Sequence, residues 1–78
     1  MDAKTPRRLS LRYDVANDVL CCSFGKPREA ITREVADGIL VRLDPDDETH
    51  VVGFTVLDLR RRSLRSRAFD VPLGAALA

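Results

Sequence analysis

Two aspartates, Asp14 and Asp18, stand four residues apart and are the first residues whose type and spacing could support chemistry. A pair of carboxylates can hold a metal ion or carry out acid–base catalysis. Aspartate is equally typical of turns, where its side chain accepts hydrogen bonds from nearby backbone N–H groups. We expect the turn role, although charge alone does not separate it from a weak metal site.

A second acidic group resembles the beginning of a calcium-binding loop; it consists of Asp44, Asp46, Asp47 and Glu48. An EF-hand loop needs glycine at its sixth position and glutamate at its twelfth. Counting from Asp44, those positions hold Thr49 and Thr55. We therefore expect a solvated hairpin loop here.

The other candidates for catalysis are Cys21, Cys22 and His50. Neighbouring strand residues point to opposite faces, so the two thiols cannot easily bind one ion. His50 is the only histidine, and no serine stands in the strained turn that a catalytic nucleophile needs. We predict that the protein is not an enzyme and needs no metal or cofactor. A weak metal-dependent enzyme that uses Asp14, Asp18 or the acidic group at residues 44–48 is an alternative hypothesis.

Five arginines fall within eight residues near the C-terminus: Arg60, Arg61, Arg62, Arg65 and Arg67. On a helix, Arg61 and Arg65 would align and could bind phosphate groups or an acidic partner. Alternatively, the run is a solvated face whose long side chains shield an apolar sheet. The chain has only one Tyr and three Phe, none within the run, so base stacking is not expected. Both interpretations stay open.

Length and composition limit the classes of protein that fit. The 78 residues form one small domain, residues 1–78, and the net charge of +1 gives no overall attraction to nucleic acid or membranes. No apolar run is long enough to span a membrane, and no signal peptide is expected. Two cysteines, expected to be reduced, suit the cytoplasm.

Five short apolar runs, each ended by a turn signal, predict strands at residues 8–13, 19–24, 30–35, 39–43 and 51–57. The second run is apolar on both faces and should be internal, whereas the third is polar and suits an edge. Asp37-Gly38 predicts a type I′ hairpin, and Gly53 a bulge or a close backbone approach. The fold class is therefore α+β: an antiparallel β-meander of four to five strands with a short Arg-rich C-terminal helix.

Apolar groups on both faces of the sheet require two covers. The first would be a helix at residues 58–68 capped by Asp58, and the second a further copy of the chain. Residues 69–78 are either an extended arm or a docked apolar tail. The predicted core contains Leu9, Leu11, Val19, Ile39, Val41, Phe54 and Val56.

Three segments resemble a known family: Tyr13-Asp14 with Asp18-Val19-Leu20, residues 34–41, and residues 52–58. They are similar to small prokaryotic proteins of the domain-of-unknown-function family numbered 2283, over about residues 11–58. Cys21-Cys22 and Leu59 with the arginines after it depart from that pattern. The resemblance implies a β-rich fold with a short C-terminal helix and no established activity. Some such proteins are encoded beside small toxin-like nucleases, which implies an antitoxin-type partner role.

The preferred prediction is therefore a non-catalytic interaction module, antitoxin-like in binding a protein partner. Nucleic-acid binding through residues 60–67 is the alternative. We also expect a homodimer, because a domain of this size buries too little surface to be more than marginally stable alone.

Overall fold

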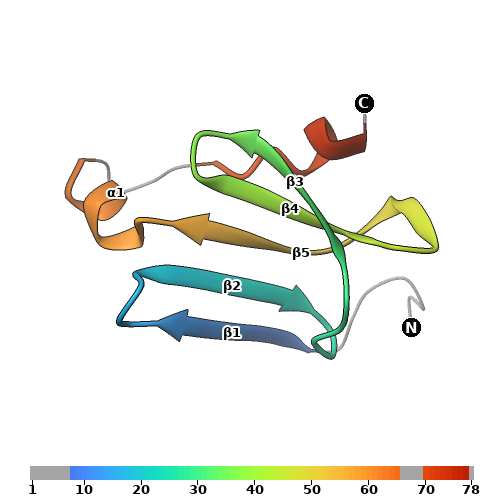
Figure 1. Ribbon diagram of the computed structural model, residues 1–78, viewed down its shortest axis with the longest axis horizontal. Coiled ribbons are helices and arrows are strands. Elements are labelled where there is room, and N and C mark those ends of the chain that lie inside the picture. Colours follow the sequence, from blue (N-terminus) through green and yellow to red (C-terminus); the bar gives the residue numbers. More distant parts are fainter. Residues whose placement is uncertain (1–7, 66–69, 78) are drawn as a thin grey trace.

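The computed structural model describes residues 8–65 and 70–77, in which five strands form one antiparallel sheet (Figure 1). The strands are β1 (Leu9–Asp14), β2 (Val19–Phe24), β3 (Ile31–Ala36), β4 (Ile39–Asp44) and β5 (Asp47–Leu57). A short helix α1 (Leu59–Arg65) and a 3-10 turn η1 (Leu73–Leu77) follow. The structure confirms the predicted α+β class, with its antiparallel sheet and short Arg-rich helix near the C-terminus.

The strand order is β1-β2-β5-β4-β3. A β1–β2 hairpin and a β3–β4–β5 meander are joined because β5, rather than β3, pairs with β2. The connection between β2 and β3 crosses the end of the sheet (Figure 1). As predicted, β2 is internal and the polar β3 lies at an edge; β1 forms the other edge.

The turns agree with the predicted positions, with two differences in detail. The hairpin at Asp37-Gly38 is confirmed. Gly38 has a positive φ of 73°, but Asp37 does not, since Asp18 and Asp58 are the only described non-glycine residues with positive φ. This geometry is not type I′; a register shift between Glu34 and Ala36 accommodates it. The acidic loop is also shorter than expected, because Asp44 pairs with Asp47 and β5 begins there.

Pairing register divides the side chains between two faces, because directly opposed residues point the same way. One row across the sheet is Leu11, Cys22, Phe54, Val41 and Arg33, and we call this side the apolar face. The adjacent row is Ser10, Ser23, Gly53, Arg42 and Thr32, on what we call the polar face.

Residues 70–77, which we call the C-terminal segment, cover part of the apolar face, whereas helix α1 does not. Val71, Leu73 and Ala76 pack against the buried Val41 and Leu43, and η1 contacts β3 and β5. Helix α1 buries none of its residues, and Leu64 is 89% exposed. The prediction that a helix at residues 58–68 covers the sheet is therefore wrong for residues 58–65, which the structure describes. Helix α1 has only seven residues, and four of them are arginines. The docked-tail alternative holds for residues 70–77.

The core prediction is confirmed for Ile39, Val41 and Val56, which are buried. It is wrong for Leu9 and Leu11, which are 56% and 64% exposed. These two leucines lie on the edge strand β1, and the C-terminal segment packs on the other half of the apolar face, over β3 to β5 (Figure 1). In the described residues, no helix has the length and apolar character needed to cross a bilayer.

Candidate functional site

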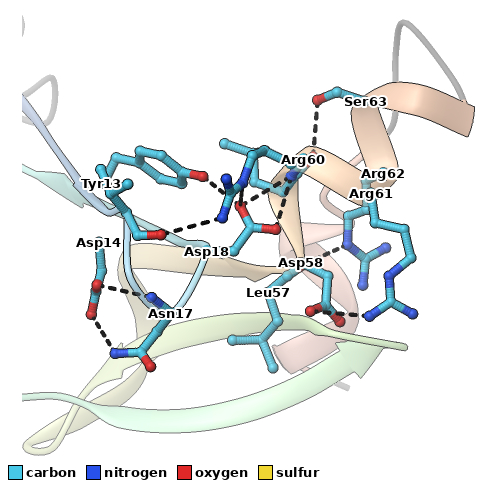
Figure 2. A network of polar contacts seen from close by, with 12 residues as sticks. Tyr13, Asp14, Asn17, Asp18, Leu57, Asp58, Arg60, Arg61, Arg62 and Ser63 are labelled. Atoms are coloured by element: carbon cyan, nitrogen blue, oxygen red, sulfur yellow. Dashed lines mark hydrogen bonds and ion pairs between the residues drawn. The ribbon is translucent and has the colours of Figure 1, made fainter.

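The turn between β1 and β2 contains both aspartates that the sequence singled out. Figure 2 shows the Asp14 carboxylate turned toward Asn17, which donates to it from its backbone N–H (3.1 Å) and its side-chain amide (2.8 Å). The amide hydrogen bond, with the backbone one, lowers the pKa of Asp14 below its usual value of 3.8. Asp14 therefore closes its own turn, as the turn interpretation predicts.

Asp18 has a longer-range role, which the sequence does not reveal. Both of its carboxylate oxygens accept the backbone N–H of Arg60, each at 3.1 Å, and its backbone carbonyl accepts the N–H of Leu59 (3.3 Å). These are N–H groups of the first turn of α1, which have no partner within the helix. Asp18 therefore caps a helix that begins 41 residues later, and its left-handed backbone (φ 58°) aims the side chain there.

Tyr13 completes this network, seen in Figure 2. Its hydroxyl donates to the Asp18 carboxylate at 2.5 Å, and the Arg60 side chain approaches the same oxygen at 3.4 Å. The hydrogen bond lowers the pKa of Asp18 and raises the pKa of Tyr13 above its usual value of 10.0. Asp18 is thus held ionised as a structural acceptor between the hairpin and the helix.

The predicted cap, Asp58, does not serve that purpose. Its backbone carbonyl accepts the Arg62 N–H (3.0 Å), but its carboxylate pairs with the Arg61 side chain (3.4 Å). The expectation that the Asp58 side chain caps α1 is therefore wrong. The reason is geometric: Asp18 already occupies the free N–H group of Arg60 from the neighbouring hairpin.

Two of the five candidate arginines are tied to the fold. Arg60 donates to Asp18 and to the carbonyl of Val15 (3.3 Å). Arg62 donates to the carbonyls of Leu57 (2.7 Å) and Asp37, and it lies so close to Gly38 that a Cβ there would collide with its guanidinium. Part of each guanidinium is therefore bonded to the protein, which leaves fewer of its N–H groups for a phosphate.

Arg61 and Arg65 line a small pocket of about 70 Å³ on this helix. Asp37 and Asp58 line it too, so the local charge is nearly balanced. Arg67 lies outside the described residues. Phosphate or acidic-partner binding by the described arginines of this run stays a prediction, and α1 does not shield the sheet as the solvated-face interpretation expects.

The other polar candidates are also dispersed. Within residues 8–65 and 70–77, no three Asp, Glu, His or Cys side chains are grouped so as to hold a metal ion. His50 is exposed, with its Nδ1 3.7 Å from Asp44. Cys22 is buried on the apolar face, where burial raises its thiol pKa, whereas Cys21 is half-buried on the polar face. The predicted divergence of the two thiols is confirmed.

The feature that sequence reasoning missed is an exposed apolar stripe on β1, formed by Leu9, Leu11 and Tyr13. Leu9 and Leu11 lie on the apolar face opposite Phe24 and Cys22, and the Phe24 ring packs edge-on against Phe54 at 6.1 Å. The stripe therefore lies beside packed aromatic side chains of β2 and β5. The alternating sequence pattern predicts that Leu9, Leu11 and Tyr13 share one face of the sheet. Only the strand order, with β1 at an edge, shows that no other described segment covers them there.

Comparison with models of protein families, with curated proteins and with solved structures finds no match for this chain.

Proposed function

We propose that this protein is a non-catalytic protein-interaction module that binds through the apolar stripe on β1. The observation that carries the proposal is the exposure of Leu9 and Leu11 side by side on an edge strand. Native edge strands are usually protected by charge, proline or a covering segment, and a contiguous apolar patch left open marks an interaction surface.

The partner that this surface fits first is a second copy of the chain. The C-terminal segment covers the β3–β5 half of the apolar face and leaves the β1 half open. Two copies that place their open halves together would each supply the missing cover, in the self-complementary contact typical of homodimers. The buried apolar residues of the described chain number seven, a small core for a domain that must be stable alone.

The wider role in this proposal is antitoxin-like. The resemblance to family 2283 implies a binding partner rather than a reaction, and a protein partner could use the same stripe. We propose a cytoplasmic location because Cys21 and Cys22 are free and diverge, so they form no disulfide with each other.

The alternatives have less geometric support. Nucleic-acid binding through residues 60–67 would have to occur beside Asp37 and Asp58, which offset the positive charge of the described arginines there. A metal-dependent enzyme would need Asp14 and Asp18 to share a ligand, but their carboxylates bind different groups.

Site-directed cross-linking tests the interaction surface. In a Cys21→Ser background, Leu11→Cys places a thiol in the stripe, and Arg12→Cys places one on the opposite face as the matched control. A bismaleimide reagent should yield a covalent dimer for Leu11→Cys alone, over a concentration series extended into the millimolar range because cysteine removes most of the leucine side chain from the contact. Monomer only at both positions, or equal yields at both, would overturn self-association through the stripe.

A further inference from the structure

The polar face of the sheet contains a groove on the side opposite to the apolar stripe. It has a volume of about 730 Å³ and is lined by Arg8 just before β1, by residues of β1, β2, β4 and β5, and by the β2–β3 connection. Leu11 of the stripe is among the lining residues of β1. Four arginines and several hydroxyl groups line it, among them Arg8, Arg12, Arg28, Arg42, Ser10 and Thr55. None of these four arginines lines the pocket beside α1, so this is a separate basic surface.

A residue without a side chain separates two of the residues that line the groove. Gly53 lies between Ser23 of β2 and Arg42 of β4 in one row, and it presents no side chain. The Arg42 guanidinium reaches across this gap and donates to Ser23 Oγ (3.3 Å) and to the Arg28 carbonyl (2.8 Å). The floor is thus pre-organised, with one guanidinium held in place.

The charge of the groove has a single sign. None of the residues lining it is acidic, whereas the pocket beside α1 contains two aspartates. Asp44 pairs with Arg28 at 2.9 Å from outside this lining. Within the described residues, Arg8, Arg12 and Arg42 form no ion pair, in a chain whose net charge is only +1.

We propose that this groove binds the phosphodiester backbone of a nucleic-acid strand. Guanidinium groups and hydroxyls are the side chains best suited to phosphate oxygens. The single sign of the charge, set against a nearly neutral chain, favours a repeating anion over a protein surface of mixed charge. No aromatic residue lines the groove, so binding rests on phosphates and is independent of base sequence.

The proposal is tested by fluorescence anisotropy with labelled oligothymidine and oligouridine over a range of salt concentrations. Three to four phosphate contacts give a slope of log K against log salt of roughly −2 to −3 for a single strand. The double variant Arg8→Ala/Arg12→Ala should make that slope shallower by about 1.4 and weaken binding roughly tenfold at about 0.15 M salt. Both side chains are exposed, so the variant should fold, which circular dichroism checks.

The matched control is Arg61→Ala/Arg65→Ala, which removes the same charge from α1 and should leave both quantities nearly unchanged. An equal loss in the two double variants would overturn the groove, since only net charge would then matter. So would absence of salt-sensitive binding, or displacement of the oligonucleotide by polyglutamate at equal charge concentration, which would point to an acidic protein partner.

Cys21 provides a second measurement inside the groove, because its thiol lines the surface whereas Cys22 is buried behind it. Bound oligonucleotide should slow alkylation of Cys21 several-fold, with Cys21→Ser as the control for background labelling. An unchanged alkylation rate at saturating oligonucleotide would contradict the proposed location. Leu9→Thr changes the stripe at a residue that does not line the groove, so it tests the stripe proposal separately from the groove proposal.

Discussion

Replacing Leu11 by threonine tests the central feature of the proposed interaction surface. Threonine suits a strand and removes most of the apolar surface, and Leu11 is already 64% exposed, so the monomer should lose little stability. Complete burial of a leucine side chain stabilises by about 1.5–3 kcal/mol, so covering the exposed 64% would contribute about 1–2 kcal/mol per copy. A symmetric dimer buries this residue once in each copy, so the total contribution of Leu11 to the free energy of association is about 2–4 kcal/mol.

Since 1.4 kcal/mol corresponds to a tenfold change, the dimer dissociation constant should rise by roughly 30-fold to several hundred-fold. Sedimentation velocity over a concentration series measures this constant directly. Arg12→Thr, the next residue on the opposite face, is the control and should leave it unchanged. An unaltered constant for Leu11→Thr, or the same change in both variants, would refute the proposed contact.

Three further predictions concern the fold that presents these surfaces. Gly53→Ala should destabilise by about 1–3 kcal/mol in urea unfolding, because its Cβ would lie less than 3.0 Å from the Cys22 carbonyl oxygen; Gly74→Ala, whose Cβ meets nothing within 4 Å, is the control. Because the pKa of Asp18 is depressed, its stabilisation is present above pH 3.8 and is lost as the pH falls through the lower folded-state value. Asp18→Asn should therefore weaken the acid dependence of the melting temperature, and an unchanged acid limb would contradict this. The raised pKa of Tyr13 predicts a loss of stability at alkaline pH, because its stabilisation is present below pH 10.0 and is lost at higher pH. In Tyr13→Phe the melting temperature should no longer show this alkaline loss.

The strands were predictable because each is specified by its own local pattern. Period-two alternation in residues 8–13 and 39–43, and the turn residues after them, give nearly the observed bounds of β1 and β4. The position of the Asp37-Gly38 hairpin is likewise local. The alternation of apolar and polar residues does not predict the strand order, because either β3 or β5 could pair with the apolar β2.

The cap of α1 could not be predicted for the same reason. Asp58 is the nearest acidic residue, yet the acceptor is Asp18, which becomes adjacent only after β2 pairs with β5 and brings the hairpin to the end of β5. The identity of the segment that covers the sheet also has a physical reason. A helix with four arginines in seven residues has no apolar face to bury, whereas the C-terminal segment offers Val71, Leu73 and Ala76.

The two proposed surfaces have one physical origin in β1. Successive residues of a strand point to opposite faces, so Leu9 and Leu11 are directed to the apolar face while Arg8 and Arg12 are directed to the polar one. A shift of the β1 register by one residue would exchange them and place arginines against Phe24 and Cys22. The buried layer beneath the stripe therefore fixes the arginines in the groove, and a destabilised β1–β2 pairing should weaken both kinds of binding together. This arrangement requires that Leu9→Thr weakens only self-association and that Arg8→Ala/Arg12→Ala weakens only oligonucleotide binding. Both kinds of binding should be lost together only when the β1–β2 hairpin is disrupted.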